Sequence, residues 1–230
     1  MGFYGIDMYF IILVVPAILF SLWAQSRVTS TFAKYQKVES YSRMTGAEVA
    51  RRILDNNDLY DVKIEQVAGN LSDHYDPRSR VVRLSQGVYG STSIAAIGVA
   101  AHEVGHAVQH ASRYIPLKAR NAIIPVTNFG SKLSVPLIFI GAIAGMDYLI
   151  NFGIILFASV TVFQLITLPV EFNASSRAMV TLDEQGILGG EELRGTRKVL
   201  SAAALTYVAA LIVSAMQLLR LVLVFGRRRN

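Results

Sequence analysis

The stretch His102-Glu103-Val104-Gly105-His106 determines how the rest of this sequence is interpreted. On a helix, His102 and His106 lie one turn apart on the same face, so both imidazole rings can reach one metal ion. Glu103 lies about 100° further round the helix, where its carboxylate can meet a water molecule at the metal without binding the metal itself. The spacing therefore predicts two metal ligands and a general base.

The residues before this motif favour a helix. Ile94 to Ala101 is a run of small and aliphatic residues, and Ser91-Thr92-Ser93 before it can supply a capping hydroxyl. The alternative interpretation is that both histidines belong to an ordinary helix surface. Because such a pattern arises by chance in only roughly a few chains per thousand of this length, we prefer the metal site.

His110 continues the four-residue series, but we expect it to belong to the helix surface. On a straight helix it lies about 12 Å along the axis from His102 and about 80° round from it, too far for three ligands to converge on one ion. Proteases whose longer motif uses a third histidine break the helix at a glycine, and none lies between His106 and His110. A third ligand must come from elsewhere in the chain.

The composition indicates an integral membrane protein. Of the 230 residues, 53% are hydrophobic and only 17% are charged, too apolar for an ordinary soluble domain. The absence of cysteine excludes a disulfide framework. The formal net charge of +6 comes from lysines and arginines beside apolar runs, so we expect a lipid bilayer and no nucleic acid among the partners.

Four apolar runs are long enough to cross a bilayer. The first contains one charged residue, Asp7, and it is too long for the core of a cleaved signal peptide, so we expect a retained anchor. The second and third form a helical hairpin with a tight turn near Met146-Asp147-Tyr148. The four runs are Phe3 to Ala24, Leu133 to Ile150, Phe152 to Val170 and Ser201 to Phe225.

The basic residues near the span ends place the metal site on the cytoplasmic side. Four full crossings put Arg227-Arg228-Arg229 on the opposite side, contrary to the usual bias, and a last segment that does not cross fully is the alternative. The residues that favour a cytoplasmic site are Arg27, Lys34, Lys37, Arg113, Lys118, Arg120, Lys132, Arg177, Arg194, Arg197 and Lys198.

Residues 26–132 predict a small α+β insertion around the motif. A capping box at Thr45-Gly46-Ala47-Glu48 predicts a short helix. Alternating apolar residues predict strands at Val62–Val67 and Ser79–Ser85, and Asp73–Pro77 between them is typical of a turn. An unpaired edge of this sheet can hold an extended substrate, or the sheet only supports the helix.

Glu171 is the acid that this topology brings to the side of the two histidines. It follows Leu168-Pro169-Val170 at the end of the third span, and a hairpin returns the chain to the side it left. A carboxylate there can be a simple interfacial residue. Because a site with two histidines needs a third ligand, we predict that His102, His106 and Glu171 bind one zinc ion per chain.

These residues resemble the YugP-type membrane zinc peptidases, with a more distant likeness to the HtpX and CAAX-protease group. The resemblance implies a zinc endopeptidase of the bacterial cell membrane, with His102, His106 and Glu171 as ligands and Glu103 as catalytic base. The distant group has Glu-x-x-x-Asp where this chain has Glu171 and Ser175, so its charged partner of a ligand histidine is not carried over. The likeness covers the first span, Asp73–Pro77 before Leu84-Ser85, Val99–Ala107, Leu168–Phe172 and Ala202–Val208.

We therefore predict a mainly α integral membrane fold, with about four transmembrane helices and a small zincin-like, gluzincin-like α+β insertion that carries HExxH on a helix. The cytoplasmic side holds this insertion and the site. The predicted domains are an anchor (1–25), the catalytic insertion (26–132), a transmembrane hairpin (133–170), a segment with the third zinc ligand (171–200), and the last transmembrane segment with its basic tail (201–230).

The predicted activity is hydrolysis of peptide bonds in membrane or membrane-proximal proteins, with Glu103 as general base. Arg177 and His74 are candidates for stabilising the oxyanion. Each has a plainer interpretation, because Arg177 suits a membrane interface and a histidine in a turn is more often structural. The alternative function is a non-catalytic membrane adaptor with a structural zinc clamp, although such a site usually has a fourth protein ligand.

Overall fold

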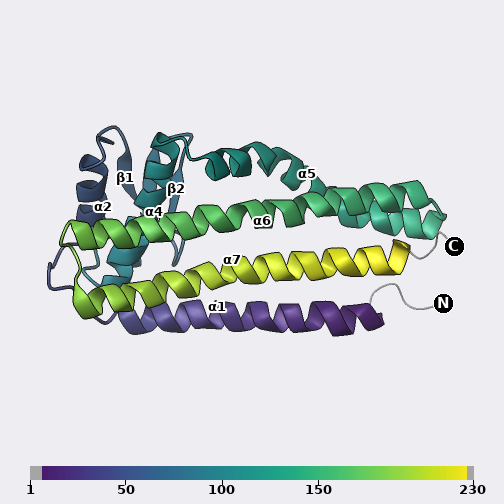
Figure 1. Ribbon diagram of the computed structural model, residues 1–230, viewed down its shortest axis with the longest axis horizontal. Helices are drawn as coiled ribbons and strands as arrows, with labels where there is room; N and C mark the ends of the chain where they lie inside the picture. The colour runs from purple at the N-terminus through teal and green to yellow at the C-terminus, as the bar shows by residue number, and fades with distance from the viewer. Residues whose placement is uncertain (1–6, 227–230) are drawn as a thin grey trace. The chain divides into compact units, whose positions relative to one another are not determined.

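The computed structural model describes residues 7–226, and it consists of long helices with one small sheet (Figure 1). The predicted class is confirmed: mainly α, with four candidate membrane helices and a small α+β part. The elements are a π-helical turn (Phe10–Val14), α1 (Val15–Tyr35), α2 (Gly46–Asp55), β1 (Lys63–Val67), β2 (His74–Asp76), β3 (Val81–Ser85), α3 (Gln86–Tyr89), α4 (Ile94–Ala111), α5 (Ile115–Ala144), α6 (Asp147–Glu184) and α7 (Gly190–Phe225).

Among the described residues, four helices are long and apolar enough to span a membrane: Phe10–Tyr35, Ile115–Ala144, Asp147–Glu184 and Gly190–Phe225. The chain divides into two compact units, and α1, α5, α6 and α7 each contribute residues to both. The first unit, the helical unit, comprises Met1–Gln25, Lys118–Pro169 and Leu205–Asn230. The second, the motif unit, comprises Ser26–Leu117 and Val170–Ala204.

In the helical unit, α5 and α6 form the predicted hairpin and pack backbone against backbone. A Cβ atom on Gly130 would lie 2.6 Å from the Leu156 carbonyl oxygen, and one on Gly153 would lie 2.8 Å from that of Ser134. Such small residues are the usual contacts between membrane helices. The second span was predicted to continue to Ile150, but α5 ends at Ala144 because Gly145 takes a left-handed conformation with φ of 68°.

Within the helical unit, an ion pair joins Asp7, just before the first helical turn, to Arg220 near the end of α7. Nε and Nη2 of Arg220 donate to Oδ2 of Asp7 at 2.9 and 2.7 Å, and the Arg220 guanidinium lies over the Phe10 ring. The Arg220 side chain is only 11% exposed. The end of α7 therefore lies beside the start of the first helix (Figure 1).

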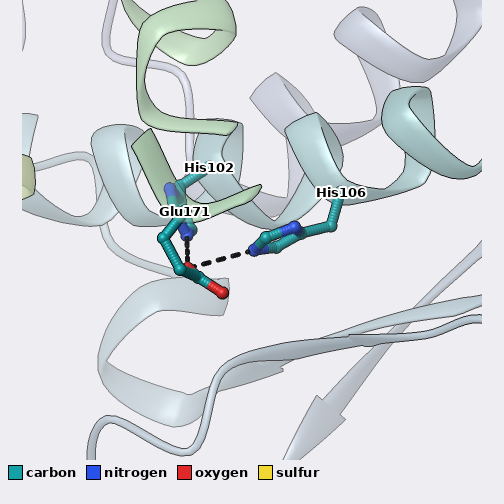
Figure 2. Close-up of side chains that lie close together, drawn as sticks. All are labelled: His102, His106 and Glu171. Carbon is teal, nitrogen blue, oxygen red and sulfur yellow. Dashed lines mark ion pairs between the residues drawn. The ribbon is translucent and has the colours of Figure 1, made fainter. Parts of the chain in front are cut away.

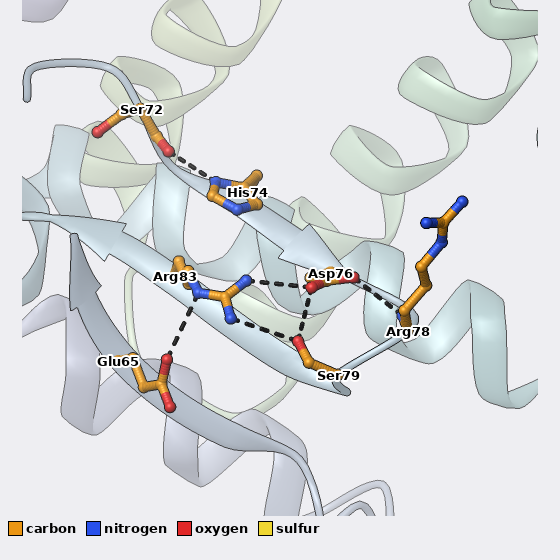
Figure 3. Close-up of polar contacts among 7 residues, drawn as sticks. All are labelled: Glu65, Ser72, His74, Asp76, Arg78, Ser79 and Arg83. Carbon is orange, nitrogen blue, oxygen red and sulfur yellow. Dashed lines mark hydrogen bonds and ion pairs between the residues drawn. The ribbon is translucent and has the colours of Figure 1, made fainter. Parts of the chain in front are cut away.

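The sheet of the motif unit has three strands in the order β1-β3-β2, with β1 parallel and β2 antiparallel to β3. The turn predicted at Asp73–Pro77 is wrong, because β2 occupies His74–Asp76. The turn-forming residues Asp73 and Asp76 lie just before the strand and at its end instead of in one turn. Asp73 accepts hydrogen bonds from the backbone and hydroxyl of Ser85, and Asp76 accepts from the Arg78 backbone (Figure 3).

One arginine ties the three strands together on the polar face of the sheet. Arg83 on β3 lies 3.4 Å from Glu65 of β1 and 3.2 Å from Asp76 of β2 (Figure 3). Opposite charges on neighbouring strands contribute roughly 0.2–1 kcal/mol each. The contacts therefore set the register of the short strand β2 against its longer neighbours.

Helix α4 is the central helix of the motif unit. Ser93 caps it by accepting a hydrogen bond from the Ala96 backbone, and α2 begins with the predicted capping box of Thr45 and Glu48. Both predicted helix starts are confirmed. Burying a large aliphatic side chain stabilises a fold by about 1.5–3 kcal/mol, and the fully buried side chains of this core include Leu54, Val82, Leu84, Ile94, Ile97, Val104, Leu182 and Leu188.

Candidate metal centre

Two histidines of α4 and a glutamate of α6 converge in the motif unit (Figure 2). Oε2 of Glu171 lies 3.3 Å from Nε2 of His102 and 3.5 Å from Nε2 of His106. The two imidazole rings are nearly perpendicular, at 87°, with centroids 4.8 Å apart. These separations are close to the roughly 3.3 Å between two ligand atoms of a tetrahedral zinc ion. The donor set therefore fits zinc.

The cluster is buried and electronegative. His106 is 8% exposed, Glu171 4% and Glu103 9%. Burial lowers the pKa of His106, but the hydrogen bond to Glu171 and the charge of Glu103 act in the opposite direction, and the resulting pKa lies above the usual value. A site that attracts a proton in this way also attracts a cation.

The second nitrogen of each ring has its own hydrogen-bond partner. Nδ1 of His102 lies 3.1 Å from Oγ of Ser175, and Nδ1 of His106 lies 3.0 Å from Oε1 of Gln109. Such partners orient metal-ligating imidazoles and raise their basicity. They leave Nε2 of each ring directed at Glu171, as a shared metal ion requires.

Glu103 lies beside the group of His102, His106 and Glu171 without belonging to it. The described residues contain one group of three side chains that could hold a metal ion, and Glu103 is outside it. It is nevertheless near enough for its charge to raise the pKa of His106. This is the arrangement expected for a base next to a metal.

A glycine inside the motif brings the two ligand-bearing helices together. A Cβ atom on Gly105 would lie 2.9 Å from the carbonyl oxygen of Ala174 on α6, closer than real Cβ contacts. Alanine at this position would push α4 and α6 apart. The small residue between the two histidines therefore sets the distance across which Glu171 reaches them.

The other candidate residues lie outside the ligand group. His110 is half-buried and hydrogen-bonded to the Tyr75 hydroxyl at 2.9 Å. His74 is exposed, and its Nδ1 lies 2.8 Å from the Ser72 carbonyl (Figure 3). Nε of Arg177 donates to Oδ1 of Asn173 at 2.8 Å. The assignment of Arg177 and His74 to the oxyanion stays a prediction.

Sequence reasoning missed Gln109. This residue is fully buried, at 0% exposed, and it contacts the ligand His106 directly. Its spacing was a usable signal, since residues three apart on a helix share a face. A glutamine three positions beyond a ligand histidine in an otherwise apolar helix is therefore worth testing as a partner of that ligand.

Comparison with known proteins identifies the family. Residues 10–226 match the family described as "Putative neutral zinc metallopeptidase". The "Putative membrane protease YugP" of Bacillus subtilis (strain 168) is 56% identical over 226 residues, which is 97% of this chain and 100% of that protein. No solved structure matches the chain significantly. The resemblance predicted from the sequence is confirmed, and this chain belongs to that family of zinc metallopeptidases.

Proposed function

We propose that the protein is a membrane-embedded zinc endopeptidase in which His102, His106 and Glu171 hold one zinc ion per chain. The observation that carries this proposal is the convergence of Oε2 of Glu171 on Nε2 of both histidines in a buried site. Two histidines and a glutamate form the ligand set of several catalytic zinc sites, in which the fourth position stays open for water or substrate.

Glu103 performs the proton transfers in this proposal. Zinc supplies a Lewis acid for the peptide carbonyl and lowers the pKa of water to about 7. Glu103 takes the proton of the attacking water while the new carbon–oxygen bond forms. It then returns the proton to the amide nitrogen while the carbon–nitrogen bond breaks. Its burial beside the ligands keeps it within reach of both events.

The substrates that we propose are membrane proteins or peptides near the membrane surface. Along α6, Glu171 lies two residues after Pro169, where the apolar part of α6 in the helical unit ends. The fold also offers an edge strand: β2 is one of the two outer strands of the sheet, and Tyr75 on β2 is hydrogen-bonded to His110 on α4. Backbone groups at such an edge can hold a peptide in an extended conformation.

We further propose that the site faces the cytoplasm, because the basic residues near the span ends lie mostly in the motif unit. The chain has no cysteine, so one introduced cysteine reports the side of the membrane. Tyr41→Cys is suitable because Tyr41 is 92% exposed. In intact cells a membrane-impermeant maleimide should label this variant only after permeabilisation. Labelling of intact cells would show that the site faces the outside of the cell instead.

A purely structural zinc site fits less well. Such sites usually have four protein ligands, and three converge in the part of the chain that the structure describes. The direct test is to reconstitute the wild type and the Glu103→Gln variant with an unstructured protein substrate such as casein and to follow peptide-bond cleavage. Both should bind zinc, and only the wild type should cleave. Cleavage by the variant would contradict the assigned base.

A further inference from the structure

The side chain of Gln109 makes three hydrogen bonds, two to α6 and one to His106 on its own helix α4. Nε2 donates to the Val170 carbonyl at 2.8 Å and to Oδ1 of Asn173 at 3.0 Å, while Oε1 lies 3.0 Å from Nδ1 of His106. The residue is 0% exposed. An amide buried this deeply is costly unless its polar atoms are paired, so its orientation is set by its neighbours.

The neighbours allow only one orientation of the amide. The Val170 carbonyl can only accept, so the Gln109 atom facing it must be the NH2 group. Arg177 leads to the same result from the other side. Its Nε can only donate, so the Asn173 atom 2.8 Å away is Oδ1, which must then accept from Gln109 as well. Oε1 is therefore the Gln109 atom that faces His106.

This orientation fixes the proton of His106. Because Oε1 of Gln109 can only accept, Nδ1 of His106 carries a hydrogen, and Nε2, beside Glu171, is the nitrogen left for a metal ion. His102 has no such constraint from Ser175, since a hydroxyl can donate or accept. The two ligand histidines are therefore held in different ways.

We propose that Gln109 is a positioning residue that locks His106 in the tautomer able to bind zinc, and that Asn173 and Arg177 lock Gln109. The inference rests on the proposed zinc site. Gln109 acts through His106 and touches neither substrate nor reacting atoms. Loss of a hydrogen-bond partner of this kind typically lowers metal affinity about 10–100-fold, and we expect that loss in Gln109→Leu.

The tautomer can be observed in the metal-free protein, without any catalysis. The chain has four histidines, so nitrogen NMR of 15N-histidine-labelled protein in detergent, at a pH where the rings are neutral, gives few signals. The wild type should show His106 protonated at Nδ1, assigned by its loss in His106→Ala. Gln109→Glu keeps an acceptor for Nδ1 and should keep this tautomer, whereas Gln109→Leu should lose it.

Zinc affinity is then measured by competition with a chelator. Gln109→Leu should bind zinc about 10–100-fold more weakly than the wild type, and Gln109→Glu, which keeps an acceptor for Nδ1 of His106 but loses the donor to Val170, should bind zinc more tightly than Gln109→Leu. Gln66→Leu makes the same change at an exposed position on β1 and should bind like the wild type. If Gln109 merely tied α4 to α6, the Glu variant would fail like the Leu variant, because a carboxylate cannot donate to Val170 as the amide does.

The proposal is overturned if wild-type His106 carries its proton on Nε2, or if the Leu variant keeps the wild-type tautomer and affinity. It is also overturned if the Leu and Glu variants lose the tautomer equally. The wild-type spectrum decides the first point even when a variant does not fold. Absence of zinc binding by the wild type would instead contradict the proposed function, and the tautomer measurement would still stand on its own.

Discussion

Gly105 of α4 touches the backbone of Ala174 on α6, and this contact sets the geometry of the metal centre. The motif supplies two histidines on one helix, but Glu171, the third member of the cluster, comes from another helix whose distance must be fixed. A Cβ atom at Gly105 would approach the Ala174 carbonyl oxygen to 2.9 Å. The position between the two histidines therefore couples helix packing to metal binding.

Replacing Gly105 should disturb both the packing of α4 on α6 and the binding of zinc. In Gly105→Ala, α4 and α6 must move apart, which we expect to cost about 1–3 kcal/mol of stability and to weaken zinc binding at least 10-fold. Thermal unfolding in detergent and zinc competition measure the two effects. Gly90→Ala is the matched control, because a Cβ there meets no atom within 4 Å. Equal zinc affinity in both variants would show that the close approach is not required.

The metal-free protein should lose part of its stability as the pH rises. The pKa of His106 is raised in the fold, so its contribution is complete below the unfolded value of about 6.5 and is lost as the pH passes the folded value. In the presence of a chelator, the difference in unfolding temperature between the wild type and His106→Gln should shrink from pH 6 to higher pH. His74→Gln, at an exposed histidine, should show no such trend. A difference that grows with pH would contradict the assigned shift.

The affinity for zinc should depend on pH in the opposite direction and increase as the pH rises. Metal binding requires the neutral imidazole, so protons compete with zinc at His106. Because the pKa of this ring is raised, zinc affinity should continue to increase at a pH above that of an ordinary histidine site. A chelator titration at several pH values measures this increase. An affinity that is already constant above about pH 6.5 would contradict it.

The hydrogen bond between Tyr75 and His110 should matter for substrate more than for metal. Tyr75→Phe removes one half-buried hydrogen bond, which contributes about 0.5–1.5 kcal/mol. We expect unchanged zinc content and weaker substrate binding, seen as a raised KM with little change in kcat, because β2 is less firmly held. Tyr60→Phe changes an exposed tyrosine and serves as control. Loss of zinc from Tyr75→Phe would instead assign the strand a role in the metal centre.

The ion pair of Asp7 and Arg220 should stabilise the helical unit without affecting zinc binding in the motif unit. Arg220→Met leaves Asp7 partly buried without its ion-pair partner and should cost about 1–3 kcal/mol, less than the 3–5 kcal/mol of a fully buried pair. Asp7→Asn combined with Arg220→Met should recover much of that loss. Zinc content should stay at the wild-type level in both variants. A double variant no more stable than Arg220→Met would show that the two side chains are not coupled.

Local sequence patterns were sufficient for much of the fold. The caps at Thr45 and Ser93, the apolar lengths of the spans and the helical hairpin each depend on residues close together in the chain. The end of α5 was predicted too late, because a single left-handed glycine, Gly145, stops a helix that hydropathy alone would continue. Strand β2 was mistaken for a turn, because Asp73 and Asp76 are typical turn formers, whereas in the fold Asp73 binds Ser85 and Asp76 binds Arg83 of the neighbouring strand β3.

The candidate site was partly predictable for the same reason. His102, Glu103 and His106 follow from spacing on one helix, and Glu171 followed from counting membrane crossings. Gln109 did not follow, because its importance depends on Val170 and Asn173, which reach it only when α6 packs against α4. Contacts between distant helices leave little trace in local pattern.

Bound metal is the measurement that tests the central claim most directly. The protein is purified in detergent and its zinc is determined by elemental analysis for the wild type, His102→Ala, Glu171→Ala and Glu184→Ala. Glu184 is an exposed acid at the end of the same helix as Glu171 and is the matched control. We predict about one zinc per chain in the wild type and in Glu184→Ala, and none in the other two variants. Zinc retained at the wild-type level by Glu171→Ala would contradict the site described here.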